Sequence, residues 1–337
     1  MTEIRFEHRQ TAHCESGAVT ALLRHSGLDL SEPMVFGLSG ALTFACIPLV
    51  KVGGMPMLAY RMPPGRVIKG VASRLGISMR VERFKGATAG MQALDHYLNA
   101  GRPVGLQASV FWLPYFPEDM RFHFNAHNMV VYGYEKSISG ETSYLVSDPT
   151  FLDPVVVEAS SLQRARFVKG MLAPKGMLYY PEAIPDAIDM VGVVRKSIRG
   201  NARMMLNTPL PFVGVRGIRY VARRLRQLGD SKQNEAFGKL FIGHMVRMQE
   251  EIGTGGAGFR FLYASFLQEC EGVLEAHGLA KASSMFTDAG DEWRRFALMV
   301  AKMLKGRMAL DFQKLSEQLV CIADMEEQAY RFLKETV

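Results

Sequence analysis

The chain has 337 residues, of which 48 % are hydrophobic and 22 % are charged. This composition is typical of a globular protein with enough apolar side chains for two domains. No stretch approaches about eighteen uninterrupted apolar residues, and no apolar run follows the charged N-terminus, so we expect neither a transmembrane helix nor a secretory signal. The scattered cysteines form no CxxC pair, which argues against a zinc site or a disulfide framework and favours a cytoplasmic location: Cys14, Cys46, Cys270 and Cys321.

The formal net charge is +7, which favours acidic partners such as nucleic acid, anionic lipid or an acidic carrier protein. The excess is concentrated, because no acidic residue lies between Asp189 and Asp230. Nine cations fall within that segment: Arg195, Lys196, Arg199, Arg203, Arg216, Arg219, Arg223, Arg224 and Arg226. Two interpretations stay open here, a solvated helical face and a docking surface.

The first 180 residues mix helical and strand patterns. The periodicity predicts helices over residues 14–26, 65–76 and the start of 90–110, and a short helix, a loop and a strand over 30–54. Strands are expected over 77–84 and at the end of 90–110. Residues 127–150 contain two β-rich runs joined by a Ser/Gly turn, the pattern of a hairpin.

The pattern becomes helical from about residue 185, after Pro181 and Pro185. We therefore predict an α+β fold with a catalytic domain over residues 1–183. An all-helical domain over 184–337 follows it and would act as a lid or a docking element for substrate or carrier.

Cys14, at the start of the first predicted helix, is the candidate nucleophile, because the N–H groups and dipole of a helix start favour a thiolate. His127 is expected at the entry of one hairpin strand and Asp148 at the far end of its neighbour. Pairing of these strands would place both side chains at one end of the sheet. The order cysteine, histidine, aspartate on helix, strand and strand is the layout of papain-like enzymes, with the histidine as base and the aspartate as its orienting group.

Acyl transfer also needs donors for the developing oxyanion. The backbone N–H of Cys14 is one candidate, and the side-chain amide of Gln10 is the second. Structural interpretations remain beside the catalytic ones. Cys14 could simply start a core helix, Asp148 before Pro149 could be a turn residue, and His123 competes with His127 for the role of base.

The segment from Gly253 to Gly258 satisfies G-x-G-x-x-G, with the third glycine of the pattern preceding a helix. A helix rather than a strand precedes it, and no Lys-Ser/Thr pair follows, so it matches neither a dinucleotide fingerprint nor a phosphate-binding loop. A turn between helices is the better interpretation, with a cover over a ligand channel as an alternative.

Residues 13–42, together with "AHNMVVYGYE" and "VSDPT", resemble the N-terminal domain of the butirosin biosynthesis protein H family. The helical part, with "EIGTGGAGFRFLYASFLQE", resembles the second domain that accompanies it. The resemblance implies a papain-like fold and transfer of an acyl group from a carrier-protein thioester to an amine. Cys14 would accept the acyl group, His127 would act as base and Asp148 would orient it.

The resemblance therefore favours an acyltransferase of specialised or lipid metabolism whose donor is an acyl carrier protein or coenzyme A. It implies a small amine acceptor and no resident cofactor or metal, since phosphopantetheine would arrive on the donor protein. Neither nucleic acid nor a membrane is an expected partner, and a homo-oligomer is left open. A cysteine peptidase or amidase with the same triad is one alternative, and a non-catalytic papain-like binding module is another.

Overall fold

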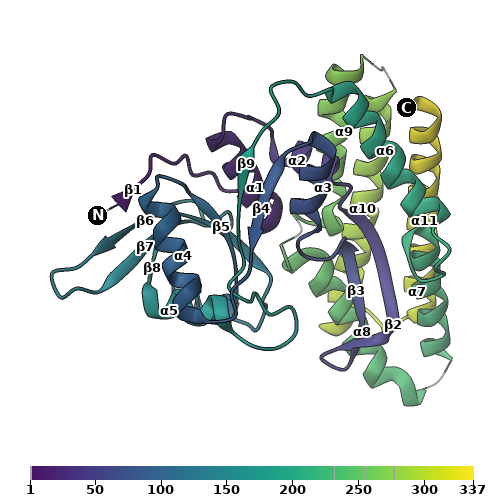
Figure 1. The fold of residues 1–337 in the computed structure, drawn as a ribbon. Helices are drawn as coiled ribbons and strands as arrows, with labels where there is room; N and C mark the ends of the chain where they lie inside the picture. The colour runs from purple at the N-terminus through teal and green to yellow at the C-terminus, as the bar shows by residue number, and fades with distance from the viewer. Residues whose placement is uncertain (1, 231, 254, 276–277) are drawn as a thin grey trace. The chain divides into compact units, whose positions relative to one another are not determined.

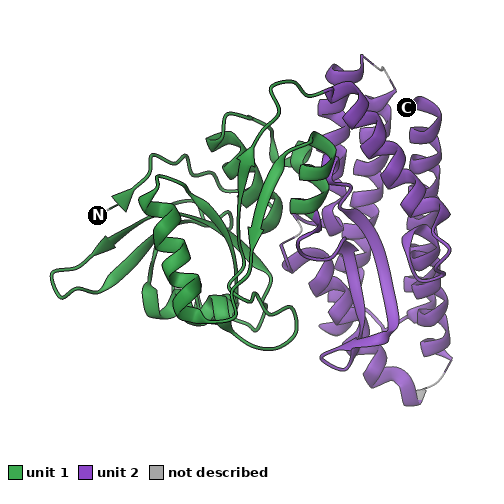
Figure 2. Cartoon of the chain, in the orientation of Figure 1, with its two compact units in different colours: residues 1–35, 67–188 green, residues 36–66, 189–337 purple. Residues whose placement is uncertain are grey.

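A computed structural model describes residues 2–230, 232–253, 255–275 and 278–337. The chain divides into two compact units, shown in Figure 2. Unit 1 contains Met1–Val35 and Val67–Ile188, and unit 2 contains Phe36–Arg66 and Asp189–Val337. In the described part, no helix is both long and apolar enough to cross a membrane.

Unit 1 is built on an antiparallel sheet, which confirms the predicted α+β class (Figure 1). The strands follow the order β4-β9-β5-β6-β7-β8, and β1 pairs with β6. Their bounds are β1 (Thr2–Glu3), β4 (Ser78–Glu82), β5 (Val104–Ala108), β6 (His127–Lys136), β7 (Thr142–Ser147), β8 (Val155–Glu158) and β9 (Leu178–Ala183). The predicted hairpin is β6 and β7, with Val130 opposite Ser147.

Three helices of unit 1, α1, α4 and α5, pack against this sheet. Their bounds are α1 (Cys14–His25), α3 (Arg66–Leu75), α4 (Ala87–Asn99) and α5 (Ala159–Phe167), and α2 (Glu32–Ser39) begins in unit 1 and ends in unit 2. Leu94 and Leu98 of α4 and Leu162 of α5 share one buried apolar cluster with Leu106 and Val131 of the sheet. α1 packs against β5, β6 and β9, so it is held against the centre of the sheet.

In its described residues, unit 2 is helical apart from one hairpin, β2 (Leu42–Val52) and β3 (Met55–Arg61). Its helices are α6 (Met190–Asn207), α7 (Gly214–Gly229), α8 (Glu235–Val246), α9 (Arg260–Leu274), α10 (Leu279–Leu304) and α11 (Phe312–Thr336), and a π-helix (Arg247–Glu251) follows α8. α11 packs against α6, α7 and α10. The predicted helical character after residue 185 is thus confirmed.

A single boundary after residue 183 would place the β2–β3 hairpin in the first domain. Its contacts place it in unit 2 instead. Phe44 of β2 stacks on Trp293 of α10 at 5.7 Å between ring centroids, and Tyr60 of β3 meets the same indole edge-on at 5.4 Å. All three side chains are buried. Burial of these rings groups residues 36–66 with the helices, so the division by contacts is discontinuous in sequence.

The glycine motif forms a turn between helices in which successive residues have positive φ. The five residues from Gly255 to Phe259 all have positive φ, including the non-glycine residues Ala257 (52°) and Phe259 (71°), while Thr254 lies outside the described residues. A Cβ at Gly258 would overlap the ring of Tyr60. The glycines therefore serve backbone geometry and close packing.

This turn delivers Arg260 into the core of unit 2. Its guanidinium binds both carboxylate oxygens of Glu326, at 2.8 and 3.1 Å, and donates to the carbonyl of Gly258 at 2.7 Å. Trp293 Nε1 donates to the same carboxylate at 2.7 Å. Arg260 and Glu326 are both fully buried, so loss of either side chain would leave the other as an unpaired buried charge.

Candidate active site

Cys14 is the first residue of α1 and is partly exposed. The residue before it, His13, caps the helix, with its Nδ1 accepting from the N–H of Ser16 at 3.3 Å. The carboxylate of Glu32 accepts from the N–H groups of Ala12 and His13 at 2.9 and 2.8 Å. Burial raises the pKa of Glu32, and these hydrogen bonds oppose that rise. Hydrogen bonds therefore hold both the residues just before Cys14 and the first turn of α1 after it.

The next residue, Glu15, is fully buried and ties α1 to α3. Its Oε1 accepts from the N–H groups of Val67 and Ile68, at 2.9 and 3.3 Å, at the start of α3. The backbone N–H of Cys14, by contrast, donates to no atom of the described residues. The first N–H groups of any helix lack partners within the helix, so this donor is available to a bound group.

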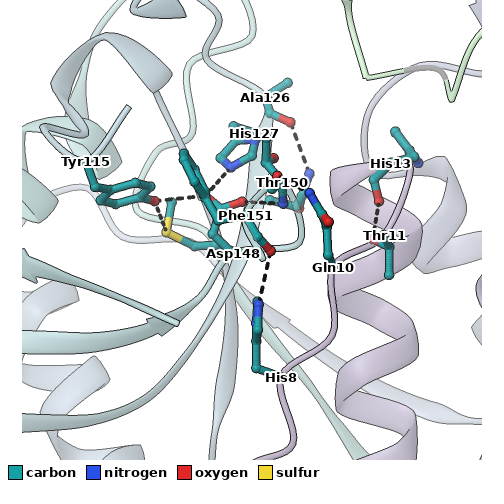
Figure 3. A network of polar contacts seen from close by, with 12 residues as sticks. His8, Gln10, Thr11, His13, Tyr115, Ala126, His127, Asp148, Thr150 and Phe151 are labelled. Carbon is teal, nitrogen blue, oxygen red and sulfur yellow. Dashed lines mark hydrogen bonds and ion pairs between the residues drawn. The ribbon is translucent and has the colours of Figure 1, made fainter. Parts of the chain in front are cut away.

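His127 and Asp148 lie at the same end of the sheet, as their placement on the hairpin predicted (Figure 3). His127 Nε2 lies 2.7 Å from Oδ2 of Asp148, and both residues are buried. The other oxygen of Asp148, Oδ1, accepts from the N–H of Thr150 at 2.9 Å. The carboxylate is thus held by the turn in which it lies and aimed at the imidazole.

The electrostatics of this pair favour opposite charges. Burial alone would lower the pKa of His127, but the charge and hydrogen bond of Asp148, followed by those of Cys14, raise it to about 10. Burial would raise the pKa of Asp148, but His127 and the hydrogen bonds from Thr150 and Tyr115 bring it below its ordinary value. An imidazolium beside a carboxylate is the expected state at neutral pH.

The Cys14 side chain lies close enough to His127 to contribute, after Asp148, to the rise in its pKa. Because Nε2 is engaged by Asp148, Nδ1 is the ring nitrogen left for the sulfur. The structure therefore brings together three of the four site residues expected from the sequence, Cys14, His127 and Asp148. A cysteine, a histidine and an aspartate in this series can move a proton between sulfur and imidazole.

His123, the alternative base, and Gln10, the predicted oxyanion donor, interact with other residues. His123 is exposed and stacks on Phe111 at 4.1 Å, with no contact to Asp148. The amide of Gln10 donates to the carbonyl of Thr150 at 3.1 Å (Figure 3). An amide carries a second N–H, so the oxyanion role of Gln10 stays a prediction.

Sequence reasoning missed the groups that hold Asp148. Tyr115 Oη donates to Oδ2 of Asp148 at 2.9 Å. His8 bridges the flanks of that aspartate, with Nδ1 at 2.8 Å from Ser147 Oγ and Nε2 at 3.1 Å from the carbonyl of Phe151 (Figure 3). The aromatic loop 109–126 and the segment before α1 lack periodicity, so no sequence signal placed either residue here.

The other cysteines offer no second nucleophile in a similar setting. Burial raises the pKa of the Cys46 thiol to about 11, and burial also raises the pKa of the Cys270 thiol. Cys321 is exposed on α11. Among the residues that the structure describes, no group of three or more His, Cys, Asp and Glu side chains could hold a metal ion.

An α+β unit with a cysteine, a histidine and an aspartate in contact defines a candidate cysteine-dependent enzyme. The chain matches the family model described as "Butirosin biosynthesis protein H, N-terminal" over residues 13–149. It also matches "Domain of unknown function (DUF4872)" over residues 160–333, more than half of the chain. The chain therefore belongs to the family defined by this second domain, with a butirosin biosynthesis protein H N-terminal domain before it. A search of curated proteins found no match.

Proposed function

We propose that unit 1 is a papain-like acyltransferase that carries an acyl group on Cys14 and releases it to an amine. The observation that supports this most is the 2.7 Å contact of His127 with Asp148, beside a Cys14 side chain that adds to the rise in the pKa of His127. The family name points to a role in the biosynthesis of a specialised metabolite such as butirosin. The proposed donor is an acyl carrier protein or coenzyme A, and the acceptor is a small amine.

The first half-reaction begins with the Cys14 proton already on His127, whose pKa is raised to about 10, and the sulfur attacks the thioester carbonyl. The bond from the carbonyl carbon to the donor sulfur breaks, and His127 returns its proton to the departing pantetheine thiol. Asp148 holds the imidazolium in place during this exchange, since their hydrogen bond is buried. The Cys14 N–H, which has no partner among the described residues, is the proposed donor to the oxyanion.

In the second half-reaction, an amine attacks acyl-Cys14 and His127 takes its proton. The C–S bond breaks, an amide forms and the Cys14 thiol is regenerated. Exchange of one thioester for another is nearly isoenergetic, whereas amide formation is downhill. Water in place of the amine would give the carboxylic acid, so exclusion of water decides between transfer and hydrolysis.

Intact mass spectrometry tests the proposal directly. Incubation with a panel of acyl-pantetheine thioesters should add one acyl group to the protein, and added amine should remove it as an amide. Cys14→Ala should carry no adduct, while Cys321→Ala, at the exposed cysteine on α11, should acylate like the parent. An adduct that persists in Cys14→Ala would refute the nucleophile. Loss of the adduct to water alone would indicate an amidase or peptidase.

A further inference from the structure

The cations between Asp189 and Asp230 form an exposed surface on α6 and α7, which we call the basic face. Its members are the eight exposed cations of the two helices: Arg195, Lys196, Arg199, Arg203, Arg216, Arg223, Arg224 and Arg226. Arg219 is excluded, because it pairs with Asp324 and Glu327 of α11 at 2.6 Å each. None of the eight forms an ion pair with an Asp or Glu of the described residues.

The spacing of these cations follows from how the helices pack. Ile198 and Ala202 of α6, and Val221 and Leu225 of α7, are fully or almost fully buried, and both helices contact α11 (Figure 1). The opposite sides face solvent. On α6, Arg195, Arg199 and Arg203 are four residues apart and form one stripe. A solvated helix surface usually mixes both signs of charge, whereas this one carries a single sign.

We propose that the basic face is the docking surface for an acidic acyl carrier protein. This inference rests on the proposed acyl transfer, because a thioester borne on a phosphopantetheine arm arrives with a protein surface attached. Carrier proteins are acidic, so their carboxylates complement the arginines, which bind carboxylates in a bidentate fashion.

Two other anionic partners fit the surface less well. A helix that lies on a lipid surface inserts exposed apolar side chains, but the apolar sides of α6 and α7 are buried and Val191 is the one large apolar side chain that either helix exposes. Single-stranded nucleic acid is held by exposed aromatic rings, and Tyr220, the aromatic residue of the two helices, is half-buried. A charged protein surface needs neither feature.

The test measures binding of a fluorescently labelled, phosphopantetheinylated acyl carrier protein to the full chain by anisotropy. The test variant is Arg195→Glu/Lys196→Glu/Arg203→Glu, at exposed residues whose side chains bond to no other residue in the described part of the chain. The control is Lys302→Glu/Lys305→Glu/Arg307→Glu, which makes the same charge change at exposed residues in and just after α10. We expect Kd to rise at least about tenfold in the test variant, to change less than about twofold in the control, and to rise with salt in the parent.

Acylation of Cys14 by an acyl-pantetheine thioester, which lacks the carrier surface, should proceed at the parental rate in both variants. Equal effects of the two variants on carrier binding, or no binding to the parent, would overturn the docking surface. Loss of binding to anionic vesicles or duplex DNA without loss of carrier binding would reassign the surface to those partners. Failure of the pantetheine substrate to acylate the parent would instead refute the proposed function, so the two failures are distinguishable.

Discussion

Tyr115 donates a hydrogen bond to the same oxygen of Asp148 that His127 contacts. Burial and the neighbouring carboxylate raise the pKa of Tyr115 well above its ordinary value, so its hydroxyl remains a donor throughout the physiological range. Asp148 thus receives hydrogen bonds from Tyr115, His127 and Thr150. A carboxylate fixed by three donors cannot swing away from the imidazole without breaking at least one bond.

Tyr115→Phe removes one of these donors with little change in shape. We expect acylation of Cys14 to slow about tenfold and the acid limb of its pH profile to move to higher pH, because Asp148 loses a bond that stabilises its charge. The control is Tyr134→Phe, whose hydroxyl bonds to Asn99 at 2.8 Å on the surface. Equal rates and pH profiles for Tyr115→Phe and the parent would show that this hydrogen bond has no effect on the pair.

Asp148→Asn removes the charge that raises the pKa of His127. Because burial acts in the opposite direction, we expect this pKa to fall from about 10 to near or below 6.5, measured by NMR titration of the imidazole. An unchanged titration of His127 would contradict the assigned electrostatics.

The same pair predicts how stability depends on pH. The raised pKa of His127 contributes stability fully below pH 6.5, and this contribution is lost as pH rises toward about 10. The lowered pKa of Asp148 contributes stability above pH 3.8, and it is lost as pH falls through the lowered value. Tm measured across this range should therefore fall at both ends, and less steeply in the double variant Asp148→Asn/His127→Gln.

Replacement of each histidine separates the two candidates for the base. His127→Ala should reduce acyl transfer by about 10²- to 10⁴-fold, since it removes the partner of both Cys14 and Asp148. His123→Ala loses only a surface ring stack on Phe111 and should retain activity within about twofold. The opposite result would move the role of base to His123.

Gly17 lies where α1 meets the segment that holds the Asp148 turn. A Cβ there would overlap Thr11 Oγ1 and lie 2.8 Å from Cβ of Pro149, while the Thr11 N–H donates to the Pro149 carbonyl at 2.9 Å. Gly17→Ala should therefore slow acylation of Cys14 and lower Tm. The double variant Thr11→Ala/Gly17→Ala should recover part of both losses, and an additive loss would contradict this steric explanation.

Sequence patterns predicted the elements of unit 1 that local rules control. Cys14 begins α1, as the helical periodicity predicted. His127 begins β6 and Asp148 directly follows β7, and strand pairing in the hairpin brings these two ends together. Tyr115, which bonds to Asp148, and His8, which bonds to the flanking Ser147 and Phe151, could not be placed in this way, since both lie on irregular backbone. The position of the β2–β3 hairpin in unit 2 depends on rings distant in sequence, Phe44 and Trp293, which no local pattern relates.

The discontinuous path of the chain limits how the protein can be divided. A gene fragment that encodes residues 189–337 would lack β2 and β3, and with them the rings of Phe44 and Tyr60 that cover Trp293. The exposed indole and the neighbouring Arg260–Glu326 pair would then face water on one side. Separate expression of the helices should require residues 36–66 to be joined to them through a linker, and a fragment cut at a single point should aggregate.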